Sequence, residues 1–240
     1  MKELTLALAR IGDLLISRTI TKSQTGEPIP NVELVIPEYQ RPYKWSAKNA
    51  NQLLDDILEA KSSNKEVYRV GTLILHKADD GDYNIVDGQQ RTITFALLLK
   101  CLNCGEITFL HQELTENYYN LHNVANNYRS LKRRIENLAP HEKSELAKYV
   151  KENCEMIVVI TDDISEAFQF FDSQNARGKK LYPHDLLKAY HLREMRDLEA
   201  DATEKVVRTW EDMDQKLLSA LFSEYLYRVK EWVKGKGSFC

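Results

Sequence analysis

NIVDGQQRTITFALLL, which spans residues 84–99, joins a short apolar run to an almost wholly apolar segment through the five residues DGQQR. The run before them predicts a strand, and the segment after them predicts a helix that is apolar on most sides. A helix of that kind belongs in the middle of a core. The stretch therefore predicts a strand, a tight turn and a central helix, with polar residues 87–91 at the turn.

The rest of the chain predicts further strands and helices around this unit. Leucine and isoleucine spacing predicts an opening helix over residues 3–16, Ser46 is the expected N-cap of another helix, and Asp80-Gly81 predicts a hairpin. Strands are expected at 32–36, 67–75, 83–86 and 154–161, and further helices at 114–152 with a break at Pro140, 165–175, 183–197 and 201–233. The fold class is α+β: a small sheet, helices packed on it and a helical C-terminal part.

Composition and charge exclude several classes of protein. The 240 residues carry a formal net charge of -3, which argues against coating nucleic acid through bulk charge. No apolar run approaches the roughly 20 residues of a membrane-spanning helix, and the N-terminus is unlike a secretory signal, so we expect a cytoplasmic protein. Four cysteines are too few for a disulfide scaffold, and the CLNC pair lacks the second pair that a zinc site needs.

The DGQQR turn has the residue types of an anion site. Gly88 permits a turn that a side chain would obstruct, and the start of the following helix exposes free N–H groups. Arg91 is a bidentate donor suited to phosphate, while Gln89 and Gln90 can hold a base edge, a ribose hydroxyl or a water. Asp87 would repel an anion, so it suggests Mg²⁺ or a hydrogen bond that holds the loop. The alternative is that Asp87 merely caps the helix and Arg91 is solvated.

Two further polar clusters lie at element boundaries, at residues 36–45 (IPEYQRPYKW) and 175–181 (NARGKKL). In the first, aromatic rings around Arg41 could stack a base, but packing beneath the sheet edge is favoured for Tyr43 and Trp45. The second places basic residues around a glycine, which equally suits a solvated helix end. No P-loop motif is present.

Four segments, in this order, resemble the DGQQR family known as domain of unknown function 262, the N-terminal domain of GmrSD-type restriction systems. They are IPEYQRPYKW, YRVGTLIL, YNIVDGQQRTITFALLL and FFDSQNARGKKLYPHDLLKAY. The resemblance implies a small mixed sheet with packed helices, similar to the core of ParB and sulfiredoxin. It also implies a nucleotide-binding domain over residues 1–195, with its core at about 30–190 and a helical insertion at about 114–152. Residues 196–240 would be a helical extension, either packed on its own domain, which is favoured, or linking to an effector domain.

The resemblance assigns site residues by position. It implies nucleotide contacts from Gln40, Arg41, Gly88, Gln89, Arg91, Asn175, Arg177 and Lys179. The catalytic candidates are Asp87, Gln89, Gln90 and Arg91, and Asp87 is also the candidate metal ligand.

The implied function is a nucleoside-triphosphate-binding and hydrolysing, Mg²⁺-dependent module of a bacterial anti-phage restriction system that acts against foreign or modified DNA. No histidine follows His191, so we expect no HNH-type nuclease chemistry in this chain. DNA would be reached through a nuclease subunit or a further domain. The alternatives are a protein-interaction subunit or a non-catalytic DNA-binding module that uses Arg41, Lys44, Arg177, Lys179 and Lys180.

Overall fold

The computed structural model describes residues 4–37, 40, 42–112, 118–164, 166, 167, 170, 209, 213, 214 and 217. The chain divides into two compact units, Met1–Phe171 and Asp172–Cys240, and every element described below lies in the first. The predicted helices at 183–197 and 201–233 lie outside the described residues, apart from isolated positions. So do the predicted contacts Arg41, Asn175, Arg177 and Lys179, and the domain boundary near residue 195 stays a prediction.

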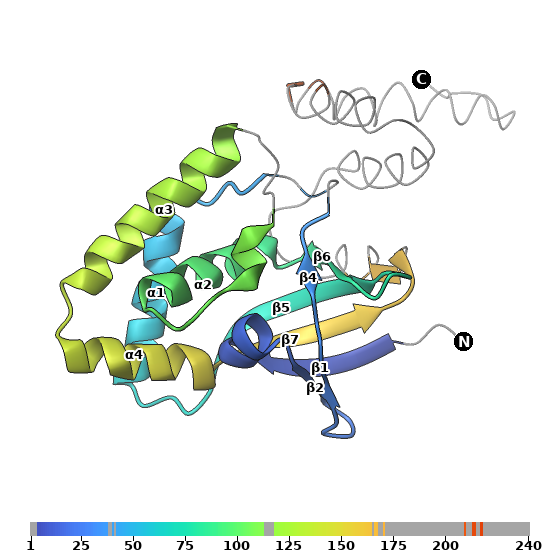
Figure 1. Ribbon diagram of the computed structural model, residues 1–240, viewed down its shortest axis with the longest axis horizontal. Helices are drawn as coiled ribbons and strands as arrows, with labels where there is room; N and C mark the ends of the chain where they lie inside the picture. Colours follow the sequence, from blue (N-terminus) through green and yellow to red (C-terminus); the bar gives the residue numbers. More distant parts are fainter. Residues whose placement is uncertain are drawn as a thin grey trace, which may run out of the picture. The chain divides into compact units, whose positions relative to one another are not determined.

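A mixed sheet of seven strands is formed by the described residues (Figure 1). The strands are β1 (Leu4–Arg10), β2 (Ile20–Lys22), β3 (Pro28–Ile29), β4 (Leu34–Val35), β5 (Tyr68–Lys77), β6 (Tyr83–Asp87) and β7 (Cys154–Thr161). Their order is β3-β2-β1-β7-β5-β6-β4. β7 pairs in parallel with β5 and antiparallel with β1, whereas β6 pairs antiparallel with β5 and in parallel with β4. The predicted α+β class is confirmed.

The helices lie at one side of the sheet (Figure 1). They are α1 (Ala47–Ser62), α2 (Gln89–Cys101), α3 (Tyr118–Glu136) and α4 (Pro140–Glu152), with a short π-helix at Asp13–Ser17 and a 3₁₀ turn at Thr108–His111. α3 packs against both α1 and α2, and α4 packs against α1. Residues 92–99 of α2 are all buried, which confirms the predicted central helix. None of the helices within the described part of the chain is long and apolar enough to cross a membrane.

The predicted opening helix is wrong over its first half. Residues 4–10 form β1, which pairs with β7 along its whole length. Leu4 and Leu8 are four residues apart, a spacing that fits both a helical repeat and the two-residue repeat of a strand. The pairing with a strand about 150 residues away in sequence decided between them. Helical structure begins only at Ile11.

Several local signals are confirmed. Ser46 is the N-cap of α1, and its backbone N–H donates to Asn49 Oδ1 at 3.0 Å. Pro140 occupies the first turn of α4, where its missing N–H is not needed. The turn at Asp80-Gly81 joins the antiparallel strands β5 and β6. All four predicted strands form, within a few residues of their expected limits.

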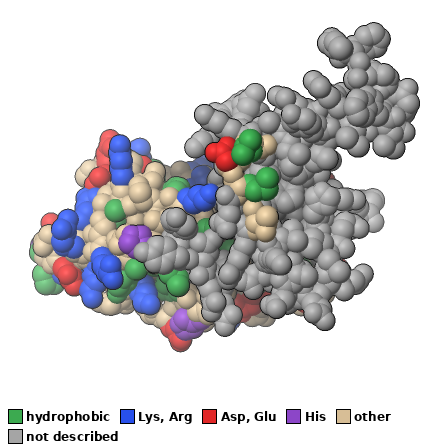
Figure 2. Space-filling view, turned by 90° about the horizontal axis from the view of Figure 1, so that it is seen from above, with side chains coloured by type: hydrophobic (Ala, Val, Ile, Leu, Met, Phe, Trp, Pro, Cys, Tyr) green, Lys and Arg blue, Asp and Glu red, His purple; other side chains and the backbone are tan. Residues whose placement is uncertain are grey.

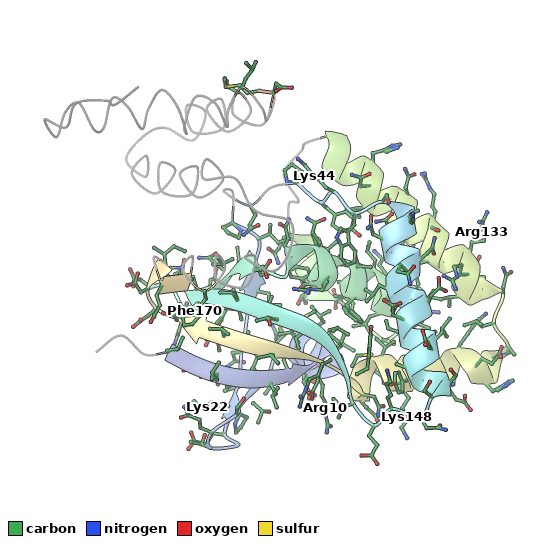
Figure 3. The ribbon with its side chains drawn as sticks, turned by 180° about the vertical axis from the view of Figure 1, so that it is seen from behind. Arg10, Lys22, Lys44, Arg133, Lys148 and Phe170 are labelled. Atoms are coloured by element: carbon green, nitrogen blue, oxygen red, sulfur yellow. The ribbon has the colours of Figure 1, made fainter. Side chains whose placement is uncertain are left out.

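The core lies on both faces of the sheet. Along β5, Leu73 and Leu75 belong to the main core shared with the helices, whereas Ile74 faces a smaller cluster on the other side. Phe170 packs against that smaller cluster and lies beside the sheet in Figure 3. The ends of β5 and β6 are therefore held from both faces, which makes them a rigid base for the turn that follows β6.

Candidate functional site

Gly88 forms the turn between β6 and α2 and is the N-cap of the helix. Its φ of 97° lies in the left-handed region, which favours glycine. A Cβ at this position would lie 2.9 Å from Leu73 Cδ1 and 3.2 Å from the Thr72 carbonyl oxygen. The predicted need for glycine is confirmed twice over, by the backbone conformation and by the close approach of β5.

The N-terminus of α2 has no side-chain cap. The first intrahelical bond is donated by Thr92 N to the Gly88 carbonyl oxygen, at 3.0 Å. The preceding N–H groups of Gln89, Gln90 and Arg91 donate no hydrogen bond to a described residue. Free N–H groups and the helix dipole together favour an anion at such a position. The alternative in which Asp87 caps this helix is wrong.

Arg91 is held against β5. Its Nη2 donates to the Thr72 carbonyl oxygen at 2.8 Å, and the same atom lies 3.8 Å from Asp87 Oδ2. The side chain is only 29% exposed, so the alternative of a solvated Arg91 is also wrong. The guanidinium lies directly over Gly71, where a Cβ would come within 2.3 Å of Nη1. The backbone of β5 therefore holds the arginine in the orientation seen here.

Asp87 has its counter-charge inside its own motif. The sequence suggests that this acid needs a cation or a hydrogen bond nearby, and the Arg91 guanidinium supplies the positive charge. Within the described ranges, no group of three or more His, Cys, Asp or Glu side chains is placed to hold a metal ion. Asp87 alone offers one carboxylate, so Mg²⁺ would need its remaining ligands from elsewhere.

Two of the predicted ligand-binding glutamines use their amides to hold backbone. Gln90 Oε1 accepts hydrogen bonds from the backbone N–H groups of Lys44, at 2.8 Å, and Trp45, at 3.1 Å. Gln40 Nε2 donates to the carbonyl oxygens of Ile85, at 2.9 Å, and Val86, at 2.8 Å. The first and second sequence motifs are thus brought together, and these two amides are the ties between them.

Gln89 differs from the other two glutamines. It is 4% exposed, and its Oε1 is buried without a hydrogen-bond partner among the described residues. A buried amide oxygen without a partner is unfavourable by about 1–3 kcal/mol. The oxygen is inaccessible to water, so the side chain would have to move before a bound molecule or a water could donate to it.

A small pocket of about 190 Å³ opens at this turn. It is lined by Gln40, Trp45, Val86, Asp87, Gly88, Gln89, Gln90 and Arg91. Sites that enclose a whole small-molecule ligand measure roughly 300–1,000 Å³. The pocket suits one end of a ligand, such as a phosphate group, and every predicted residue of the DGQQR motif lines it.

Tyr43 anchors the segment before α1. It is fully buried; its hydroxyl lies 2.7 Å from Thr94 Oγ1 and accepts a hydrogen bond from Asn127 Nδ2 at 2.8 Å. Burial raises the pKa of Tyr43. The predicted packing role of this ring is confirmed, and Trp45 is half-buried against the same core. Figure 3 shows Lys44, the residue between Tyr43 and Trp45 in the sequence, just before the first turn of α1.

Four residues that support the site were not identified from the sequence. Gly71 and Thr72 of β5 seat Arg91. Asn123 Nδ2 donates to the Tyr43 carbonyl oxygen at 3.0 Å, and Asn127 Nδ2 donates to that of Trp45 at 2.8 Å. A glycine within a strand signals close approach of another group, and two asparagines four residues apart share one helix face. Both signals are present in the sequence, but neither names its partner.

Comparison with known families gives two matches. A family model described as "GmrSD restriction endonuclease, N-terminal domain" matches residues 16–192. A second model, described as "Family of unknown function (DUF7834)", matches residues 202–239. No curated protein matches the chain. The first match covers the pocket, its supporting strand and all the sequence motifs quoted above.

Proposed function

The chain belongs to the family of GmrSD restriction endonuclease N-terminal domains, and from this we propose that it binds a nucleoside triphosphate as part of a bacterial anti-phage restriction system. Family membership supports a component of a restriction system, with the nuclease on another domain or subunit. The motif order supports a ParB/sulfiredoxin-like core. The proposed ligand and its hydrolysis rest on the pocket.

One observation carries the nucleotide proposal: the uncapped N-terminus of α2 and the oriented side chain of Arg91 line the same small pocket. The N–H groups of α2 and Arg91 would hold the phosphates. Gln89 also lines the pocket, and its buried Oε1 would accept a hydrogen bond from a ligand hydroxyl or a bound water only if the side chain turned outward. The pocket is smaller than a whole nucleotide, so the remainder of the ligand would extend beyond it.

Asp87 fits Mg²⁺ only together with the nucleotide. Protein-bound Mg²⁺ commonly takes one or two carboxylates and completes its octahedron with substrate phosphates and waters. When bound, the ion would offset the charge of the phosphates. Of the pocket-lining residues, Asp87 is the one with an acidic side chain, and none is a histidine. With no separate general base in that set, we expect slow turnover and a role for binding itself as a switch.

The test uses the full chain and fluorescently labelled ATP, GTP, CTP and UTP, each with and without Mg²⁺. Arg91→Ala should weaken binding of the preferred nucleotide by tenfold or more, about 1.4 kcal/mol. Asp87→Asn should remove the effect of Mg²⁺ on affinity. The matched control is Arg69→Ala, which removes an exposed arginine paired with Glu155 at 2.9 Å, outside the pocket-lining set. Wild-type affinity in Arg91→Ala, or no binding by the wild type, would refute the proposal.

A second candidate function, direct DNA binding, is favoured by α3. Arg129, Lys132 and Arg133 are exposed on this helix, and neither arginine forms an ion pair with a described residue. Figure 3 shows Arg133 pointing away from α3, and Figure 2 shows lysine and arginine side chains on the described part of one face. Like charges four residues apart destabilise a helix slightly, which a polyanion would relieve.

This candidate predicts binding of duplex DNA without nucleotide. Affinity should fall linearly with salt on logarithmic axes, and an Arg129→Gln/Arg133→Gln variant should have a shallower slope. Lys148→Gln, which neutralises an exposed cation on α4, serves as the control. An unchanged slope in the double variant would exclude α3 as the contact surface.

A further inference from the structure

Strand β5 contains one extra residue next to the candidate site. In its parallel pairing with β7, the register passes from Arg69 opposite Glu155 to Thr72 opposite Ile157. β5 thus advances by three residues while β7 advances by two, which defines a bulge. Gly71 lies within it, with a φ of 122° that favours glycine. Bulges of this kind commonly lie beside functional sites, where they redirect groups.

The bulge lies beneath Arg91. A Cβ on Gly71 would lie 2.3 Å from Nη1 and 2.9 Å from Cζ of that arginine. Thr72 contacts Arg91 through its backbone, because its carbonyl oxygen accepts a hydrogen bond from Nη2. The same carbonyl oxygen would lie 3.2 Å from a Cβ on Gly88. Residues 71–73 therefore pack against both Gly88 and Arg91 of the DGQQR motif.

We infer that Gly71 is a positioning residue for Arg91. It affects the ligand only indirectly, because its lack of a side chain leaves room for the guanidinium. This rests on the proposed function, in which Arg91 holds phosphate. Any side chain at residue 71 would occupy the seat of the guanidinium and push it away from the Thr72 carbonyl oxygen. Arg91 would then lose the orientation in which it lines the pocket together with Gly88 and Gln89.

The chain offers a control for the backbone strain alone. Gly81 has a φ of 98°, and a Cβ there would meet nothing within 4 Å. Gly81→Ala and Gly71→Ala therefore both place alanine in a conformation that favours glycine, but only Gly71→Ala also displaces Arg91. A difference in ligand binding between the two variants reports the displacement.

The test is a double-mutant cycle in the full chain, with Gly71→Ala, Arg91→Lys and the two combined. Binding of the preferred labelled nucleotide is measured beside unfolding in urea. Gly71→Ala should weaken binding by about tenfold or more, and Gly81→Ala should leave it unchanged. In the Arg91→Lys background, Gly71→Ala should cost at most about twofold, because lysine lacks the guanidinium atoms that the new Cβ would meet.

Equal loss of binding in both backgrounds would overturn the inference, because Gly71 would then act on the fold and not through Arg91. If the wild type binds none of the nucleotides, the proposed function fails, and the positioning role fails with it. The unfolding cycle separates this case: non-additive unfolding free energies would still establish the contact, as a purely structural one. Wild-type affinity in Gly71→Ala would also overturn the inference.

Discussion

Gln90→Ala should destabilise the fold by about 1.5 kcal/mol, although the sequence marks this residue for chemistry. Its Oε1 accepts from two backbone N–H groups, those of Lys44 and Trp45. Each lost hydrogen bond costs about 1 kcal/mol net, which gives about 2 kcal/mol. Alanine returns a few tenths of a kcal/mol because it is the better helix former. The expected loss in the free energy of unfolding is therefore about 1.5 kcal/mol. It reflects the loss of the two hydrogen bonds that hold the segment before α1 against α2.

The assay is urea denaturation followed by circular dichroism at 222 nm, with the free energy of unfolding extrapolated to water. Gln52→Ala is the matched control, since Gln52 lies on α1 and its amide donates to Asp56 Oδ1 at 2.8 Å on the exposed surface, its one side-chain hydrogen bond to a described residue. The gain in helix propensity is the same, and the lost contact is worth roughly 0.2–0.5 kcal/mol, so the change should be close to zero. Gln90→Glu retains acceptor oxygens for both N–H groups and should recover most of the stability.

The reasoning would be refuted by equal stabilities of Gln90→Ala and Gln52→Ala. If Gln90→Ala then also lost nucleotide binding, Gln90 would be a ligand contact and not a tie between the two motifs. If Gln90→Glu were as unstable as Gln90→Ala, the acceptor oxygen would not be the group that matters.

Two more predictions concern the interior. Tyr43→Phe removes the hydroxyl shared by Thr94 and Asn127, so it should lower the free energy of unfolding by about 1–3 kcal/mol, measured in urea; an unchanged value would mean that the network is not stabilising. Burial raises the pKa of the Cys154 thiol from 9.0 to about 12, so its contribution to stability is present below pH 9 and lost as the pH rises from 9 towards 12. Urea midpoints across this range should fall less steeply for Cys154→Ala than for the wild type, and equal slopes would contradict the assignment.

The local part of the fold could be predicted because its causes are local. The change from strand pattern to apolar helix at residues 84–99 needs nothing beyond its own residues, and the same holds for Ser46 at the start of α1 and Pro140 at the start of α4. β1 could not be assigned correctly, because leucines four residues apart fit two periodicities and the partner strand lies far along the chain.

In the candidate site too, features set by adjacent residues could be predicted, and features set by distant residues could not. Gly88 and the helix start after it follow from adjacent residues, so their place in the pocket was predictable. The position of the Arg91 side chain was not predictable. Its acceptor is a backbone carbonyl oxygen nineteen residues earlier, and any residue type at position 72 would supply one. The contacts of Gln90 with the backbone N–H groups of Lys44 and Trp45 were not predictable for a similar reason, because backbone groups leave no trace in residue identity.

Asp87 decides how the pocket could discriminate among anions. Arg91 and the free N–H groups of α2 present positive charge at one half-buried turn, and the carboxylate 3.8 Å from the guanidinium offsets it. Charges about 4 Å apart interact by about 1 kcal/mol in water and about 4 kcal/mol at an effective dielectric constant of 20. An arriving phosphate must compete with Asp87 for Arg91 and is repelled by the Asp87 carboxylate at the same time.

A divalent cation on Asp87 would reverse that repulsion, because the cation would neutralise the carboxylate and attract the phosphate. Dependence on Mg²⁺, more than affinity itself, therefore separates a nucleotide site from an ion pair that only closes the turn.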